Sequence, residues 1–94
     1  MAGHKAENLL RKGLDDPDPY CRRRALLSLA KINPINPKEI AVRFLDDPDP
    51  NMRQATIELL HSIDDIEFKK KAKKQLLGDD SPHVATAAKK ILVT

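Results

Sequence analysis

The chain has 94 residues, of which 33% are charged and 3% aromatic, and its formal net charge is +3. This length corresponds to one domain, and no apolar run approaches the roughly 18 residues of a membrane-spanning helix. One cysteine excludes an internal disulfide and is typical of a reducing compartment. The N-terminus lacks the apolar stretch of a secretion signal. We therefore expect a single cytoplasmic domain over residues 1–94 with no membrane association.

The first helix pair is predicted on either side of a proline-rich turn. Apolar residues recur at helical spacing over residues 4–14, and the prolines that follow prevent this helix from continuing. Asp18 followed by Pro19 is typical of an N-cap and a first helical residue, which predicts a second helix over about 19–32. The apolar residues of the first helix are Ala6, Leu9, Leu10 and Leu14.

Two further helix pairs repeat this arrangement. The sequence places capping-box spacing before each first helix and an N-cap with proline before each second helix. The capping boxes are Asn36 with Glu39 and Asp64 with Glu67, and the cap and proline pairs are Asp49-Pro50 and Ser81-Pro82. The predicted helices span about 37–45, 50–63, 65–77 and 82–93. Because the connections are short, consecutive helices are expected to lie roughly antiparallel.

An internal repeat explains why the pairs look alike. The sequence Leu-Asp-Asp-Pro-Asp-Pro occupies residues 14–19 and again 45–50, and a degraded copy occupies 77–82. Self-similarity at a period of about 30 residues indicates stacked supersecondary units. The sequence therefore predicts an all-α fold of six helices in three repeats, at about 4–32, 36–63 and 64–93.

Alignment of the copies separates core positions from the ends of the stack. Three aligned positions of the second helices are apolar or small in all copies and should form the core: Cys21/Met52/Val84, Ala25/Thr56/Ala88 and Leu29/Leu60/Leu92. Four flanking positions are apolar inside and polar at an end: Leu26/Ile57/Lys89, Arg24/Ala55/Ala87, Ser28/Leu59/Ile91 and Arg11/Val42/Lys74. Stacked repeats need apolar neighbours and polar ends. We therefore expect three repeats to be the whole solenoid.

These residues resemble HEAT repeats, and more closely the short HEAT-like repeats of phycobilisome-lyase-type proteins. The resemblance rests on two stretches, Leu14-x-Asp16 through Cys21-Arg22-x-x-Ala25-Leu26-x-x-Leu29 and Leu45-x-Asp47 through Met52-Arg53-x-x-Thr56-Ile57-x-x-Leu60. It implies a right-handed α-solenoid with first helices on the convex side and second helices on the concave side. It also implies a ladder of Asp–Arg pairs, Asp16 with Arg22 and Asp47 with Arg53. The third copy has Asp79 but Ala85, so the ladder should end there.

Few residues offer chemistry beyond this scaffold. Cys21 is a candidate bilin attachment site or nucleophile, but its aligned partners Met52 and Val84 favour a buried structural thiol. His4, His61 and His83 lack the spacing of metal ligands. The acidic turns at 15–18 and 46–49 lack the glycine and distal glutamate of a calcium loop and are explained by capping. We therefore predict no enzyme, no metal and no cofactor.

Two basic segments, Arg22 to Arg24 and Lys69 to Lys74, are candidates for phosphate contacts. No aromatic residues interleave with them, so base stacking has little support. The favoured hypothesis is a small monomeric interaction module that binds a protein or peptide on the second-helix face. Nucleic-acid binding is the alternative, and a bilin-lyase accessory role is a remote one. The expected contact residues are Tyr20, Arg23, Leu27, Lys31, Asn51, Gln54, Glu58, His61 and His83.

Overall fold

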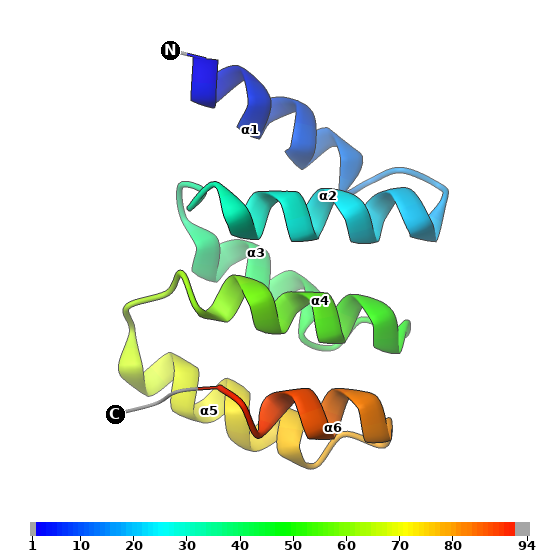
Figure 1. Cartoon of the computed structure of the whole chain (residues 1–94), viewed down its shortest axis with the longest axis vertical. Helices are drawn as coiled ribbons and strands as arrows, with labels where there is room; N and C mark the ends of the chain where they lie inside the picture. Colours follow the sequence, from blue (N-terminus) through cyan, green and yellow to red (C-terminus); the bar gives the residue numbers. More distant parts are fainter. Residues whose placement is uncertain (1, 92–94) are drawn as a thin grey trace.

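The structure, a computed structural model, describes the backbone of residues 2–91 and the side chains of residues 5–91. Within these residues it contains six helices and no strand: α1 Ala2–Gly13, α2 Pro19–Lys31, α3 Pro37–Phe44, α4 Pro50–Leu60, α5 Ile66–Leu77 and α6 Pro82–Ala88. The second helices α2, α4 and α6 lie side by side in one layer, with α3 and α5 behind them (Figure 1). This arrangement is the predicted helical solenoid.

The starts of α2 and α4 follow from their local sequence. The carboxylate of Asp18 accepts a hydrogen bond from the N–H of Tyr20, and that of Asp49 accepts one from the N–H of Asn51, each at 2.9 Å. Proline occupies the first turn of both helices, where its missing N–H costs nothing. Ser81 occupies the equivalent position before α6 but makes no side-chain capping bond.

The two predicted capping boxes are wrong in detail. Asn36 has a left-handed backbone with φ of 54° and no side-chain cap bond. The following proline disfavours a helical backbone at this residue, and asparagine tolerates the left-handed region. Before α5 the cap is Asp65 rather than Asp64, and its carboxylate accepts a hydrogen bond from the N–H of Phe68 at 3.0 Å.

The last helix is shorter than predicted, because α6 ends at Ala88 and not near residue 93. Ile91 nevertheless reaches the core and is 1% exposed. Its backbone carbonyl accepts a hydrogen bond from the Nζ of Lys73 at 2.8 Å, which ties the segment after α6 to α5. Leu92, predicted to belong to the core stripe, lies outside the described residues.

The core lies between the two helix layers and is aliphatic, as the small aromatic content requires. Its largest fully buried side chains are Leu26, Leu29, Met52, Leu59, Leu60, Leu76, Ile91 and Val84. Thr56 is also fully buried, and its hydroxyl donates to the carbonyl of Met52 at 2.8 Å. The hydroxyl is thus satisfied without a partner outside α4.

Two apolar positions are more exposed than the alignment predicts. Val42 on α3 is 57% exposed because α3 packs mainly on α4, which leaves its outer side in water. Leu9 on α1 is 68% exposed, although its aligned counterpart Ile40 is buried. A Cβ added at Gly13 would lie 2.9 Å from the Cβ of Ala25, so α1 approaches α2 closely at this end. The close approach does not extend to Leu9, which α2 leaves uncovered.

The ends of the stack are polar, but the predicted exposure fails at Ser28, which is partly buried, and at Arg11. Arg24, Lys74 and Lys89 are exposed, whereas Leu26 and Ile57 in the interior are buried. Arg11, predicted to face water, is partly buried. Its side chain pairs with Glu7 at 3.0 Å and donates to the carbonyl of Ile35 in the loop before the next repeat. No described helix is long and apolar enough to cross a membrane.

Candidate functional site

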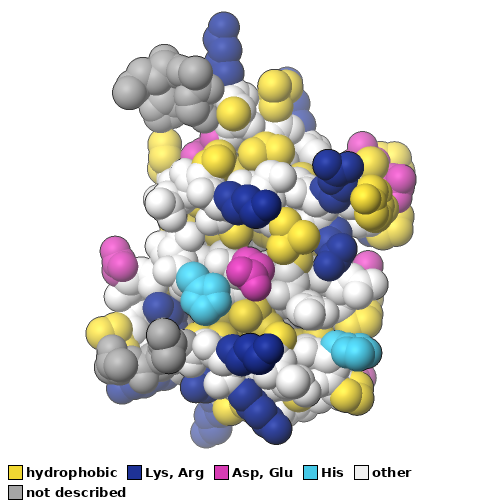
Figure 2. All heavy atoms as spheres, in the orientation of Figure 1, with side chains coloured by type: hydrophobic (Ala, Val, Ile, Leu, Met, Phe, Trp, Pro, Cys, Tyr) yellow, Lys and Arg dark blue, Asp and Glu magenta, His cyan; other side chains and the backbone are white. Residues whose placement is uncertain are grey.

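The nine predicted contact residues lie on one surface, the outward side of α2, α4 and α6, which we call the second-helix face. Leu27 is partly buried and the others are exposed. The residues are Tyr20, Arg23, Leu27 and Lys31 on α2, Asn51, Gln54 and Glu58 on α4, His61 at its C-cap, and His83 on α6. Figure 2 shows this face, on which basic side chains are spread among apolar ones.

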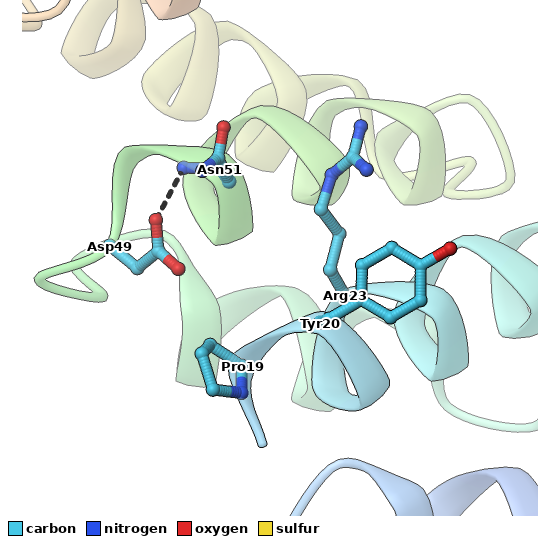
Figure 3. Close-up of a pocket in the computed structure, with 5 residues that line it drawn as sticks. All are labelled: Pro19, Tyr20, Arg23, Asp49 and Asn51. Atoms are coloured by element: carbon cyan, nitrogen blue, oxygen red, sulfur yellow. Dashed lines mark hydrogen bonds between the residues drawn. The ribbon is translucent and has the colours of Figure 1, made fainter.

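A first hollow, of about 400 Å³, opens between the N-terminal ends of α2 and α4. Figure 3 shows that Arg23 reaches from α2 toward α4 across this hollow. Tyr20, which is 61% exposed, also lines the hollow. The guanidinium of Arg24 lies 5.8 Å from the centre of the tyrosine ring. The lining residues are Pro19, Tyr20, Arg23, Asp49 and Asn51.

A second hollow, of about 470 Å³, opens between the C-terminal halves of the same two helices. Its apolar lining comes from Leu27 and Ala30, and its charged lining from Lys31 and Glu58. The Oγ of Ser62 donates to the carbonyl of Ala30 at 3.4 Å and connects the two helices there. Asn33 and His61 complete the lining. The groove between α2 and α4 therefore has an open hollow at each end.

The charged side chains of this face are not used within the fold. Arg23, Lys31 and Glu58 form no ion pair with any other described residue. Asp49 differs, because its carboxylate is engaged by the N–H of Asn51 as the cap of α4. Arg23 and Lys31 therefore have no ion pair with another described residue that binding would have to break.

The opposite side of the molecule behaves differently, because its polar side chains join consecutive repeats. Arg43 on α3 pairs with Asp15 before α2. Lys38 on α3 pairs with Asp65 before α5 at 2.8 Å. Gln75 on α5 donates to the carboxylate of Asp46 at 2.6 Å. Side chains of the first helices and their loops therefore hold consecutive repeats together.

The predicted Asp–Arg ladder exists with different partners. Arg53 donates to the backbone carbonyl of Asp47 at 2.7 Å, and not to its carboxylate. Its guanidinium then grips the carboxylate of Asp79 in the next repeat with two hydrogen bonds of 2.8 and 3.0 Å. The carboxylate of Asp47 accepts from the N–H of Asp49 instead. The ladder therefore reaches the third repeat through Asp79, at the point where the alignment predicts that it ends.

The Arg53–Asp79 pair is nearly out of solvent, with side chains 14% and 9% exposed. The hydrogen bonds from Arg53 lower the pKa of the Asp79 carboxyl, against the opposing effect of burial. The same bonds raise the pKa of Arg53. This pair is a structural clamp between the second and third repeats.

The first repeat has a weaker form of this contact. Arg22 donates to the backbone carbonyls of Asp16 and Pro17 at 2.8 and 3.1 Å. The carboxylate of Asp16 accepts from the N–H of Asp18 rather than from Arg22. Among the described residues Arg22 forms no ion pair, so the predicted Asp16–Arg22 pair is wrong at the side-chain level.

Cys21 is exposed, which overturns its assignment to the core. The aligned Met52 and Val84 are buried because α4 packs beside α2 and α6 beside α4, whereas no other second helix of the described residues lies on the far side of α2. The Sγ of Cys21 lies 3.7 Å from a carboxylate oxygen of Asp18. Desolvation and this acidic surrounding raise the pKa of the thiol, which disfavours the thiolate that a nucleophile needs.

Metal and phosphate chemistry gain no support from the placement of the remaining candidates. The described side chains contain no group of three potential metal ligands, and the side chain of His4 lies outside them. Arg22 to Arg24 belong to α2, whereas Lys69 to Lys74 belong to α5 in the other layer. The two basic segments therefore do not form one surface.

Sequence reasoning found the exposed residues of the second-helix face but not its hollows. Pro19 and Asp49 were assigned only to capping, and Ala30, Asn33 and Ser62 were not singled out. All five lie at helix ends or in the following turn, where side chains of neighbouring repeats meet only in the folded stack.

Comparison with known proteins gives a family for the chain. A family model described as HEAT repeats matches residues 6–92. Neither the curated proteins nor the solved structures include a match to the chain.

Proposed function

Since the chain belongs to the HEAT repeat family, we propose that it is a cytoplasmic interaction module that holds a protein or peptide segment on the second-helix face. HEAT repeats generally mediate protein interaction and scaffolding and are typically not enzymes. The single cysteine, exposed and unpaired, accords with a reducing compartment.

One observation carries this proposal: the two sides of the stack use their polar side chains differently. On the first-helix side, Lys38 and Arg43 are held by carboxylates of neighbouring repeats. On the second-helix face, Arg23, Lys31 and Glu58 form no ion pair with other described residues and surround two hollows. Exposed side chains that contribute nothing to the fold, on rigid helices around a groove, are suited to binding.

The size of the surface is compatible with a specific interface. The molecule measures 37 × 29 × 16 Å, and the second-helix layer runs along its longest dimension. A typical specific interface buries about 800 Å² per partner. Three neighbouring helices that together span the 37 Å dimension present an area of that size.

Site-specific photo-crosslinking tests the proposal. A photoreactive amino acid replaces Gln54, which is exposed in the middle of the second-helix face, and in a matched variant it replaces Lys71 on α5. We expect a discrete crosslinked protein from cell extract for the Gln54 position and none for the Lys71 position. Equal crosslinking at both positions, or none at Gln54, contradicts the proposal.

The observations favour a protein partner over nucleic acid. The basic segments on α2 and α5 occupy different layers, and acidic Asp49 and Glu58 line the two hollows. Phosphate binding would give an affinity for labelled oligonucleotides that falls steeply as salt rises. We expect no such binding in fluorescence anisotropy. The remote alternative, a bilin-lyase accessory role, predicts transfer of a bilin pigment on mixing, which we do not expect.

We also propose that the module is a monomer of 10.6 kDa. Arg24 at one end of the stack and Lys74 and Lys89 at the other are exposed, and burying such charges without partners is costly. Light scattering coupled to size-exclusion chromatography measures the mass directly. A larger mass in dilute solution would contradict the proposal.

A further inference from the structure

The chemistry of the second-helix face narrows the class of partner, if the proposed function holds. Arg23, Leu27 and Lys31 are spaced four residues apart on α2, so they form one stripe with steps of about 6 Å. Arg23 lines the first hollow, and Leu27 and Lys31 line the second. Along the groove the stripe therefore presents a cation, an apolar side chain and a second cation.

The facing helix α4 contributes neutral amides to the same groove. Asn51 lines the first hollow, and Gln54, one turn further along α4, is exposed. A side-chain amide both donates and accepts hydrogen bonds. It therefore matches the N–H and C=O groups of a peptide backbone, which are unpaired when that backbone is extended.

The α2 side of the groove is basic. Arg23 and Lys31 are exposed there, and neither is in an ion pair with another described residue. The acids of the groove lie on the α4 side, where Asp49 is engaged as the cap of α4 and Glu58 lines the second hollow. Figure 2 shows basic side chains spread over this face. Cations without ion-pair partners along one side of a groove attract the acidic groups of a partner.

We propose that the occupant of the groove between α2 and α4 is an extended acidic peptide segment of a partner protein, with the pattern acidic–x–apolar–x–acidic. Two residues of extended chain advance about 6.6 Å, which matches the step between Arg23, Leu27 and Lys31. The two carboxylates meet Arg23 and Lys31, and the apolar side chain enters the hollow beside Leu27 and Ala30.

Nucleic acid fits this groove less well than an acidic peptide. Glu58 and Asp49 line the hollows and repel a continuous run of phosphates. Tyr20 is the only aromatic residue of the second helices, whereas sequence-tolerant binding of single strands relies on successive stacking platforms. A peptide places its charges only at chosen positions and avoids both acids.

A selection from a display library of random linear 12-residue peptides, with the purified protein as bait, tests the proposal. We expect enriched peptides to carry Asp or Glu two residues before and two residues after an apolar residue. Binding is then measured by fluorescence anisotropy with a synthetic copy of an enriched peptide. Selected peptides without acidic residues, or with the acids four residues before and four residues after the apolar residue as on a helix, overturn the pattern.

Matched charge-reversal variants locate the binding. Arg23→Glu with Lys31→Glu reverses both cations of the stripe, and Lys71→Glu with Lys74→Glu makes the same charge change on α5. We expect the first variant to weaken binding by about tenfold or more and the second by less than about threefold. A peptide in which Lys replaces both acids should regain affinity for the first variant, which shows that the variant is folded. Equal losses in both variants, or no recovery with the reversed peptide, overturn the proposal.

The same experiment separates this inference from the proposed function on which it rests. If the selected peptides contain no acids but lose binding when Gln54 is replaced by Arg, the second-helix face is still the binding site. Only the acidic pattern is then overturned. If no peptide is enriched, or if binding is insensitive to every change on α2 and α4, both fail. Displacement of the peptide by a labelled 20-nucleotide single strand of higher affinity also overturns the choice of partner.

Discussion

The two sides of this solenoid differ in how they use their exposed charged side chains. On the first-helix side, Arg43 and Lys38 reach across to Asp15 and Asp65 of neighbouring repeats. The second helices are joined by apolar packing and by the nearly buried Arg53–Asp79 clamp, and the exposed cations such as Arg23 are left without described ion-pair partners. The comparison teaches that a face whose polar groups are unneeded for folding is free to serve a partner.

The clamp between the second and third repeats gives the largest expected effect. Arg53→Ala leaves the nearly buried Asp79 carboxylate without its two hydrogen bonds, which we expect to cost about 3 kcal/mol of unfolding free energy. Arg22→Ala removes bonds to backbone carbonyls only and should cost about 1 kcal/mol. Urea titration of both variants measures the difference. Equal small losses would show that the clamp contributes little.

The pH dependence of stability sharpens the same point. The pKa of Asp79 is lowered by Arg53 in the folded state, so the carboxylate stabilises the fold above its ordinary pKa of about 3.9. That stability is lost as the pH falls from this value through the lower folded pKa. We expect an acid-induced loss of stability below about pH 4 that is smaller in Asp79→Asn. Thermal unfolding between pH 6 and pH 2 provides the measurement.

Asp65 contributes in the same direction, because its hydrogen bond from Lys38 lowers its pKa. This exposed pair is separate from the clamp. Asp79→Asn therefore keeps the contribution of Asp65 to the pH dependence. An identical pH profile for the wild type and Asp79→Asn would contradict the role of the clamp.

A single change on the first-helix side should slightly lower stability, whereas a single change on the second-helix face should weaken binding. Lys38→Ala removes an exposed cross-repeat ion pair and should cost between about 0 and 1 kcal/mol of stability, with no effect on binding. Lys31→Ala removes no described ion pair and should leave stability unchanged while weakening the binding of an acidic peptide. Urea titration and anisotropy of both variants test this. A loss of stability for Lys31→Ala that exceeds the loss for Lys38→Ala would break the comparison.

Some local features of this fold, such as the caps of α2 and α4, were predictable from the sequence, whereas features that depend on neighbouring repeats were not. Asp18-Pro19 and Asp49-Pro50 determine the starts of α2 and α4 through bonds within three residues. The exposure of Cys21 depends instead on the absence of a second helix beyond α2. The exposure of Val42 depends on α3 packing mainly on α4. The alignment predicts burial for both residues from the equivalent positions of other repeats, but those repeats have different neighbours.

The candidate site divides in the same way. The exposed stripe of α2 was predictable because helical periodicity places Arg23 and Lys31 away from the core. The partner of Arg53 was not, since Asp79 is 26 residues away and meets it only when the second and third repeats stack. The hollows likewise depend on the spacing between α2 and α4, which no local pattern contains.

The central claim is that the second-helix face, and not the first-helix side, receives the partner. Titration of the ¹⁵N-labelled protein with a selected acidic peptide, followed by amide chemical shifts, tests it residue by residue. The account predicts that the largest shifts fall on α2 and α4 around Arg23, Leu27 and Gln54, with α3 and the outer side of α5 unchanged. Largest shifts on α3 or α5, with the amides of α2 and α4 unmoved, would contradict it.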